Sequence, residues 1–587
     1  MFSRSPMRHA ALTGSLALAL SSGASADLSV AGRVVTLNGE PLVGAMVSLR
    51  TSDAHAGADV ISVFTGPSGR FEFPERVGGV ASLEVRSLKY RPLEPIGALD
   101  RDTSNLTIVV ERRLNQADVA PASAWLASAG DRAQKAYFVR DCIGCHQVPA
   151  PEVRRYAGLI AGVDNADPAV VRQQSWESIV KYMNYVSAWE FGRASPDGAP
   201  EPGPVYSVSG GGQVATFMAE HFVGAMDEID GYDYGAPLIV NEKTVIKEYE
   251  VSGPNAIREA VLLPETNELW AADVSSNRMY AIDVATGRQR YLEVPAEGDV
   301  GPHSLFRDAD DTLWITPFFD SVVSHYDPRD ETWKTWATTS VDGKPIGIHD
   351  LSFGAEHELM TDKKGRIWYS DIGNNGVGYL DPATGKAKSF PAPEVPGRTG
   401  RNPALYGLVM TSDRGHIWYS QLGIGVVGSF DVNAEQFDEP VELASIDAGP
   451  RRLTINDDDI MYAALYGTGQ LLAFDTKSRK QVGLYDLPDT GSAPYAATWD
   501  PVRKVVWIPT SNGDVIYRFD PQSKTFGVLP LPRQGAFLRM VDIDRATGML
   551  ITSYANIVQF VHGPRMVLMI DPGDGAYGRP AVAEERR

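Results

Sequence analysis

Two cysteines and one histidine in a single pentapeptide are the residues of this chain most suited to chemistry. Cys142 and Cys145 are the only cysteines among 587 residues, and His146 directly follows the second. Two thiols at this spacing can each reach a vinyl group of one porphyrin, and the adjacent histidine then binds the iron as an axial ligand. The spacing predicts one covalent haem c per chain, and therefore redox chemistry.

Two other sites use a Cys-x-x-Cys pair. A thioredoxin-like dithiol would lie in a βαβ context, and a zinc site would need two further ligands close by. The sequence around Cys142 and Cys145 presents neither feature. We therefore interpret the motif as a haem attachment site.

The region around the motif, residues 121–226, has a helical composition, with a helix predicted over 132–139 just before Cys142. It resembles class I cytochrome c, a fold whose helices pack around one haem. The resemblance implies that the Val148-Pro149 stretch supplies a backbone carbonyl to Nδ1 of His146, which leaves Nε2 for the iron.

The second axial ligand is predicted to be Met183, so that His146 and Met183 together hold the iron. Residues 176–183 are similar to the helix of related monohaem domains that ends in a ligand methionine. A thioether ligand raises the reduction potential, which suits an electron acceptor. Met218 and His221, on a predicted closing helix over 213–223, remain alternatives, since a helical methionine is often a packing residue.

Residues 1–26 have the pattern of a signal peptide. Arg4 and Arg8 precede an apolar stretch over 10–20, and small residues at 24–26 offer a cleavage site. No later run of about 18 uncharged apolar residues follows. We expect a periplasmic protein without stable membrane insertion.

The charge balance narrows the choice of partners. The formal net charge of −20 becomes −22 when Arg4 and Arg8 leave with the leader (−20 − 2), because the leader has no acidic residue. Such a surface repels phosphate backbones, so nucleic acid is an unsuitable partner. A basic redox protein would be attracted, although the charge also serves solubility alone.

Residues 28–113 show short alternating runs that predict a small β-sandwich. Asn38-Gly39 lies between two such runs, which favours a tight hairpin. The sequences of residues 30–35, 41–47 and 65–73 resemble those of the carboxypeptidase regulatory-like domain. That resemblance implies a module for stability and docking, without catalysis.

Residues 237–572 form an internal repeat, followed by a tail at 573–587. An aromatic-centred strand recurs at steps of 44, 54, 50, 44 and 45 residues, at Trp270, Trp314, Trp368, Trp418, Tyr462 and Trp507. Seven strand ends carry an aspartate, at Asp283, Asp327, Asp381, Asp431, Asp475, Asp520 and Asp571. Seven units of this length predict a seven-bladed β-propeller. The last unit is one strand short, so we expect residues 238–251 to close the ring.

The sequences of residues 365–371 and 376–385 resemble the blades of the streptogramin lyase (virginiamycin B lyase-like) propeller family. The resemblance implies the fold and a magnesium-dependent lyase with a histidine base and acidic metal ligands late in the ring. Beyond the fifth unit the only histidine is His562, so the lyase residues are not assigned here.

The residues that begin the innermost strands of a propeller surround its central channel. Here they form a polar and cationic set: Arg258, His303, His349, Asp350, Tyr406, Arg451, Arg452, Tyr495 and Arg539. This set predicts a pocket for an anionic or phenolic ligand. His303 and His349 could bind a metal or act as acid and base, or they could be structural hydrogen bonders.

The expected fold is mainly β and multidomain: an N-terminal β-sandwich, a small α-helical cytochrome c domain and a C-terminal seven-bladed β-propeller. The favoured function is a cytochrome c-linked oxidoreductase, in which the propeller binds a small organic substrate and the haem passes electrons to a soluble carrier such as another cytochrome. Two alternatives are a magnesium-dependent carbon–oxygen lyase and a non-catalytic electron-transfer or binding module.

Overall fold

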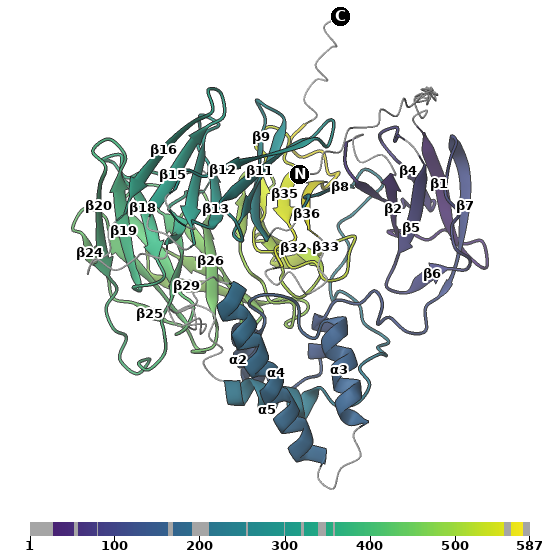
Figure 1. The fold of residues 1–587 in the computed structure, drawn as a ribbon, viewed down its shortest axis with the longest axis horizontal. Helices are drawn as coiled ribbons and strands as arrows, with labels where there is room; N and C mark the ends of the chain where they lie inside the picture. Colours follow the sequence, from purple (N-terminus) through teal and green to yellow (C-terminus); the bar gives the residue numbers. More distant parts are fainter. Residues whose placement is uncertain are drawn as a thin grey trace, which may run out of the picture.

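The computed structural model describes residues 28–578 with gaps at 52–56, 79, 163–167, 191–210, 254–255, 297, 299, 319–321, 339–347, 356–358 and 557–564; the side chains of 185–190 and 211 are also outside it. The signal peptide prediction for 1–26, His562 and the end of the tail lie outside the described residues. The described chain has three parts: a sandwich, a helical layer and a ring of sheets (Figure 1).

The N-terminal sandwich consists of two sheets. The first has the order β4-β1-β7-β6, and the second begins β5-β2-β3. The strands are β1 (Val30–Thr36), β2 (Met46–Thr51), β3 (Val60–Phe64), β4 (Arg70–Glu72), β5 (Ala81–Arg86), β6 (Tyr90–Pro92) and β7 (Thr103–Arg112). Their alternating apolar residues form one buried core that continues into the first blade of the ring.

The predicted tight hairpin at Asn38-Gly39 is confirmed, although it is short. The Gly39 amide donates to the Thr36 carbonyl at 2.9 Å, the Leu42 amide donates to the Val34 carbonyl at 3.0 Å, and Val35 forms an antiparallel bridge with Pro41. However, β1 pairs with β4 and β7, whereas β2 pairs with β3 and β5 in the other sheet. The turn signal fixes the local reversal of the chain, but packing of the two faces decides which sheet the next strand joins.

Five helices follow the sandwich in the described part of the chain: α1 (Ser123–Leu126), α2 (Arg132–Cys142), α3 (Pro151–Ala161), α4 (Pro168–Glu190) and α5 (Gly211–His221). Asp131 and Gln134 form a capping box at the start of α2. The helices share an aromatic core in which Phe138 stacks on Phe217 at 4.4 Å and Trp176 meets Phe222 at 5.9 Å. None of the described helices is long and apolar enough to cross a membrane.

Seven antiparallel sheets follow. The first four blades contain β9 (Ile257–Leu263), β10 (Glu268–Asp273), β11 (Arg278–Asp283) and β12 (Gln289–Glu293); β13 (Pro302–Arg307), β14 (Leu313–Pro317), β15 (Val322–Asp327) and β16 (Thr332–Ala337); β17 (Ile348–Leu351), β18 (Ile367–Asp371), β19 (Gly376–Asp381) and β20 (Lys386–Pro391); and β21 (Leu405–Met410), β22 (His416–Gln421), β23 (Val426–Asp431), β24 (Gln436–Phe437) and β25 (Val441–Glu442).

The remaining blades contain β26 (Pro450–Ile455), β27 (Ile460–Leu465), β28 (Gln470–Asp475) and β29 (Lys480–Asp486); β30 (Thr498–Asp500), β31 (Val505–Pro509), β32 (Val515–Asp520) and β33 (Thr525–Pro530); and β34 (Asp542–Ile543), β35 (Leu550–Ser553), β36 (Met566–Asp571) and β8 (Val245–Glu250). Innermost strands contact one another from β9 round to β30, and β34 and β35 contact β9. The sheets therefore form a closed ring, the predicted seven-bladed β-propeller.

The repeated residues have the structural roles that their spacing predicts. The six repeated aromatic residues lie on the second strands and are buried between blades. Each of the seven aspartates ends a third strand and accepts a hydrogen bond from a backbone amide two or three residues later. Turn capping therefore accounts for the recurrence of these aspartates.

One sheet joins the sandwich to the ring. β8 pairs with β36 as the predicted outer strand of the last blade, and its other edge pairs with β3. The result is a seven-stranded sheet of order β34-β35-β36-β8-β3-β2-β5. Neither edge of β8 is exposed, and the sandwich is attached to the propeller by backbone hydrogen bonds.

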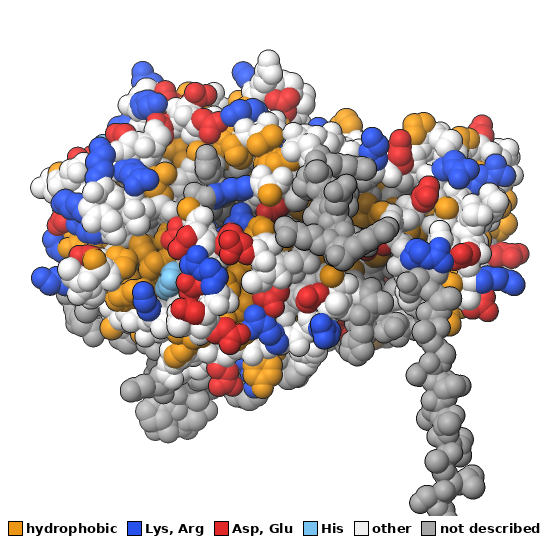
Figure 2. All heavy atoms as spheres, turned by 90° about the horizontal axis from the view of Figure 1, so that it is seen from above, with side chains coloured by type: hydrophobic (Ala, Val, Ile, Leu, Met, Phe, Trp, Pro, Cys, Tyr) orange, Lys and Arg blue, Asp and Glu red, His pale blue; other side chains and the backbone are white. Residues whose placement is uncertain are grey.

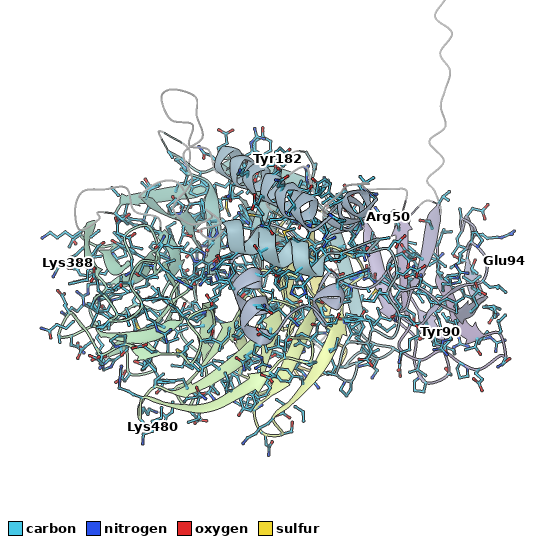
Figure 3. All side chains as sticks on the ribbon, turned by 90° about the horizontal axis from the view of Figure 1, so that it is seen from below. Arg50, Tyr90, Glu94, Tyr182, Lys388 and Lys480 are labelled. Carbon is cyan, nitrogen blue, oxygen red and sulfur yellow. The ribbon has the colours of Figure 1, made fainter. Side chains whose placement is uncertain are left out.

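The helices cover one face of the ring, as Figures 1 and 3 show from two directions. The view in Figure 2 is from the opposite side, where acidic and basic side chains intermix. One face of the propeller is therefore covered by helices, whereas the view of the opposite side shows charged side chains at the surface.

Candidate functional site

The predicted haem attachment segment, residues 142–146, is called the haem motif. It begins at the C-terminal end of α2 and lies against the ring. Cys142 is the last residue of α2, and His146 is buried with its Nδ1 2.7 Å from the carbonyl of Gln147. The carbonyl was expected from the Val148-Pro149 stretch; it comes from one residue earlier because the chain turns back directly after His146. An Nδ1–H that donates to this carbonyl leaves Nε2 as the basic nitrogen.

These residues fit haem c by their chemistry. Cys142 and Cys145 are not joined in a disulfide, and burial raises the pKa of Cys142 to about 12. Burial also lowers the pKa of His146, which keeps the imidazole neutral as an iron ligand must be. The surrounding side chains, which include Phe138 and Val148, form an apolar cluster suited to a porphyrin.

Two buried polar groups of the propeller hold the segment after the motif. The side-chain amide of Gln147 donates to Asp514 at 2.8 Å and to the Ala536 carbonyl at 3.0 Å. Asn512 accepts from the Val148 amide at 2.9 Å and donates to its carbonyl at 3.1 Å. Burial raises the pKa of Asp514 to about 6. The orientation of the loop that carries His146 is thus set by the sixth blade and the connection that follows it.

The other side of the motif contacts the fifth blade. The Tyr466 hydroxyl donates a short hydrogen bond to the Ile143 carbonyl, in the middle of the motif. Arg140 of α2 forms a buried ion pair with Asp447 at 2.6 Å. Gly467 lies so close to α2 that a Cβ there would be 2.9 Å from the Ala136 carbonyl. The motif is therefore docked on the ring by direct polar contacts and close packing.

The predicted second ligand and its alternatives lie on the two helices that pack together, α4 and α5. Met183 is half-buried, one turn after Ile179 and Val180, which pack in the helical core. Met218 is buried inside that core, and His221 lies 4.6 Å from the Phe217 ring. Met183 stays the predicted ligand.

The structure brings the predicted channel residues together. All nine are at most 2 % exposed and lie at or just before the innermost strands: Arg258, His303, His349, Asp350, Tyr406, Arg451, Arg452, Tyr495 and Arg539. Arg539 lies 2.9 Å from Nε2 of His303 and donates to the Tyr406 hydroxyl at 3.3 Å. The Tyr406 and Tyr495 hydroxyls share a short hydrogen bond. These contacts link four blades across the axis; the side chains form a packed cluster, which we call the axial cluster.

Cations dominate the axial cluster. Arg452 pairs with Glu259 at 2.5 Å and with Asp350 at 3.3 Å. Burial raises the pKa of Asp350 to about 7, although the charge of Arg452 acts in the opposite direction. Burial would also raise the pKa of Tyr495, but the charges of Arg539 and other arginines outweigh it and lower that pKa. The cluster therefore favours negative charge on a phenol or on a ligand.

The two histidines are held differently. The rings of His303 and His349 lie 4.7 Å apart. His303 contacts Ser304 at 2.9 Å through Nδ1 and Arg539 through Nε2. His349 is buried, and neither of its nitrogens has a hydrogen-bond partner among the described residues. Burial, reinforced by neighbouring arginines, keeps the pKa of both imidazoles well below the usual value. His349 is therefore one of the groups in this cluster with unused hydrogen-bonding capacity, as is the Asp350 carboxyl.

Sequence reasoning missed four residues of this region. Glu259 and Ser304 directly follow the predicted Arg258 and His303, and both contact Arg452. Both residues lie at the start of an innermost strand, so the rule that selected the channel residues could have selected them too. Tyr466 and Asp514 lie in loops between strands, where the repeat pattern carries no signal for contact with the haem motif.

The axial cluster and the haem motif are continuous. The Arg451 guanidinium lies 3.9 Å from the Tyr466 ring and 4.4 Å from the Tyr495 ring. Tyr466 contacts the motif, and Tyr495 contacts Tyr406 in the cluster. An unbroken set of contacts thus runs from Ile143 to the propeller axis.

Comparison with known proteins gives a fold likeness only. No family model and no curated protein matches the chain. Among solved structures, it is similar to a streptogramin B lyase (TM-score 0.46, 15% identity, 56% of this chain and 97% of that chain). It is also similar to virginiamycin B lyase from Staphylococcus aureus (0.45, 13%, 56% and 99%) and to a chain of a mitotic checkpoint complex (0.42, 11%, 58% and 94%). These likenesses say nothing about chemistry, and the ring is assigned from its strand pairings.

Proposed function

We propose that this chain is a periplasmic c-type haem oxidoreductase, in which the propeller binds a small organic substrate beside the haem domain. Cys142 and Cys145 would attach the haem, and His146 and Met183 would hold its iron. When bound, haem c supplies a one-electron acceptor that a soluble carrier can reoxidise. The formal net charge of −20 favours a basic carrier.

One observation supports this function over the alternatives: the haem motif is docked on the ring beside the axial cluster, with Tyr466 between the two. A redox domain that served only as an appendage would have no need of polar contacts that lead toward the ring axis. Here Tyr466 joins Ile143 of the motif to the stacked Arg451 and Tyr495. A substrate bound at the axis would lie within a few side chains of the haem.

The axial cluster offers the remaining chemistry. His349 is neutral and has unused hydrogen-bonding capacity, so it can accept a hydrogen bond from the proton of a substrate hydroxyl and orient that group. Arg451 and Arg539 provide positive charge that stabilises the anion formed when that proton leaves. These roles suit a phenol, whose one-electron oxidation releases one proton and passes one electron to the haem; a hydroxy acid releases two electrons and would reduce the haem twice, with reoxidation by the soluble carrier in between.

The test is substrate-dependent reduction of the oxidised haem protein. The mature chain is produced with a cytochrome c maturation system, mixed anaerobically with a panel of phenols and hydroxy acids, and followed by its absorbance. We expect at least one compound to reduce the protein, and His349→Ala to slow that reduction by about tenfold or more, because the substrate loses a hydrogen bond worth about 1–3 kcal/mol. His416→Ala, in the fourth blade outside the axial cluster, is the matched control and should react like the wild type.

A second measurement tests the haem assignment itself. The Cys142→Ala, Cys145→Ala double variant should lose the covalent tetrapyrrole mass. Met183→Ala should lose the charge-transfer band of thioether-ligated ferric haem, whereas Met218→Ala should keep it. A colourless wild-type protein would end the proposal. A coloured protein that no compound reduces, but that exchanges electrons rapidly with a cytochrome, would identify an electron-transfer module instead.

A further inference from the structure

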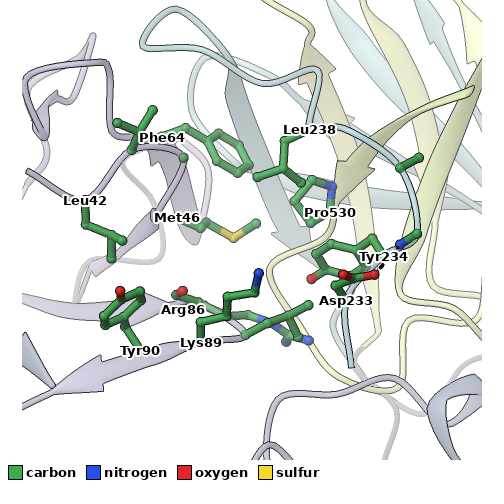
Figure 4. Close-up of a pocket in the computed structure, with 16 residues that line it drawn as sticks. Leu42, Met46, Phe64, Arg86, Lys89, Tyr90, Asp233, Tyr234, Leu238 and Pro530 are labelled. Carbon is green, nitrogen blue, oxygen red and sulfur yellow. Dashed lines mark hydrogen bonds between the residues drawn. The ribbon is translucent and has the colours of Figure 1, made fainter. Parts of the chain in front are cut away.

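A cavity of about 610 Å³ lies where the sandwich meets the propeller (Figure 4). Its volume is in the range of small-molecule sites, which occur preferentially between domains. The cavity is lined by neither the haem motif nor the axial cluster. We propose that it binds an organic anion with an aromatic or aliphatic body.

The walls of the cavity are apolar and preformed. Leu42, Met46 and Phe64 line it from the sandwich, and Leu238 and Pro530 line it from the propeller side. Both walls are fixed relative to each other, because β3 pairs with β8 immediately beside them. A ligand would bury apolar surface here without paying for the ordering of a loop.

Two basic residues line the cavity, Arg86 at the end of β5 and Lys89 after it. Arg86 is held in place, since it donates to the Pro532 carbonyl at 3.0 Å and to the Val119 carbonyl at 2.9 Å. Its guanidinium also lies 3.7 Å from the buried Asp514 carboxylate, which balances its charge.

Lys89 adds a second cation. In Figure 4 its ammonium projects into the same space as Met46, and within the described chain no carboxylate pairs with it. The one carboxylate of the lining, Asp233, accepts from the Gly235 amide at 2.9 Å. Asp514 balances Arg86, so the cation of the lining that has no carboxylate partner among the described residues is Lys89. An ammonium in this position, beside an apolar wall, favours a ligand with an anionic group.

Two phenols complete the cavity. Tyr90 and Tyr234 lie at opposite sides of it in Figure 4. Burial raises the pKa of Tyr234 to about 12, so this hydroxyl stays protonated at neutral pH and can donate to an anion. Aromatic faces beside an apolar wall suit a planar hydrophobic body. A carboxylate on an aromatic ring combines both requirements.

The experiment is isothermal titration calorimetry of the mature full-length chain with naphthalene-2-carboxylate and with naphthalene-2-methanol, which has the same ring but no charge. We expect the carboxylate to bind more tightly by about tenfold or more, because it gains charge-assisted hydrogen bonds. Lys89→Gln should remove most of that preference. Leu238→Trp, which fills the cavity from a half-exposed position, should abolish binding of both compounds.

Lys480→Gln is the matched control, since Lys480 lies on β29, far from Tyr90 in Figure 3. It should bind both probes like the wild type. The proposal is overturned if neither probe binds, or if Leu238→Trp binds as the wild type does. Equal affinity for the two probes, or an unchanged preference in Lys89→Gln, would refute recognition of the anion. Circular dichroism of each variant shows that a loss of binding is not a loss of fold.

Discussion

The contact between Tyr466 and Ile143 gives the sharpest test of how the haem motif is docked. Tyr466→Phe removes one hydroxyl and leaves the ring, which still packs beneath Arg451 at 3.9 Å. The Ile143 carbonyl, buried in the motif, then loses its partner from the propeller. A matched variant exists, because the buried Tyr419 hydroxyl has no hydrogen-bond partner among the described residues.

The two substitutions should change the free energy of local opening by different amounts and in opposite directions. A buried group that loses its hydrogen-bond partner costs about 1–3 kcal/mol, so Tyr466→Phe should favour local opening of the motif by roughly 5- to 150-fold. Tyr419→Phe removes a hydroxyl that is buried without a partner, which is neutral or stabilising. Both substitutions delete the same atom, so the difference between them isolates the hydrogen bond.

Hydrogen exchange is the appropriate assay, because a protein of several domains has no single free energy of unfolding. The Ile143 amide donates to the Val139 carbonyl at the end of α2, so its exchange reports opening at this position. We expect faster exchange there in Tyr466→Phe and wild-type exchange in Tyr419→Phe. Equal exchange in all three proteins would show that the hydroxyl does not hold the motif.

Three further predictions concern the ring and its contact with the helices. Arg452→Met leaves the Glu259 and Asp350 carboxylates buried without their cation, so the denaturant midpoint should fall by an amount equivalent to about 3–5 kcal/mol; an unchanged midpoint would contradict this. Because burial raises the pKa of Asp350 to about 7, the native state retains a proton that the unfolded state releases above about pH 4, and stability falls as pH rises to 7. In Asp350→Asn, stability measured by unfolding from pH 4 to 8 should depend less on pH. An unchanged pH dependence would contradict the raised pKa of Asp350. Gly467→Ala brings a Cβ into steric overlap with the Asp447 carbonyl and to 2.9 Å from the Ala136 carbonyl, so the propeller loops under α2 must shift and α2 should be cleaved faster in limited proteolysis than in the wild type; unchanged cleavage would contradict this.

The sequence predicted the parts of the fold that repeat. Six blades carry a buried aromatic residue at the same position and all seven carry a capping aspartate, so the repeats indicate one register and a misassigned repeat is recognised by comparison with the others. The positions of His303 and His349 follow from that register. The predicted haem ligands, His146 and Met183, depend instead on one short motif and one resemblance. No repeated copy of that motif is present to check the assignment.

What the sequence could not predict are contacts between elements far apart in the chain. The pairing of β3 with β8 joins residues near 60 to residues near 248, and both strands have ordinary alternating sequences. Tyr466 and Asp514 occur once each, in loops, and nothing local distinguishes them from other loop residues. The Asn38-Gly39 signal predicted the local hairpin correctly, but local turn chemistry does not specify which sheet receives the next long strand.

The β3–β8 pairing also explains why the helical layer lies on the ring. The helices occur in the chain between these two strands, and pairing of the strands brings both ends of the intervening segment to one edge of the last blade. A segment anchored at both ends has far fewer placements than a domain on a single linker, so its docking costs less conformational entropy. The polar contacts at Ile143, Arg140 and Gln147 then select one placement among the few that remain. Loosening β8 should therefore weaken the contact between the haem motif and the propeller axis, although β8 touches neither.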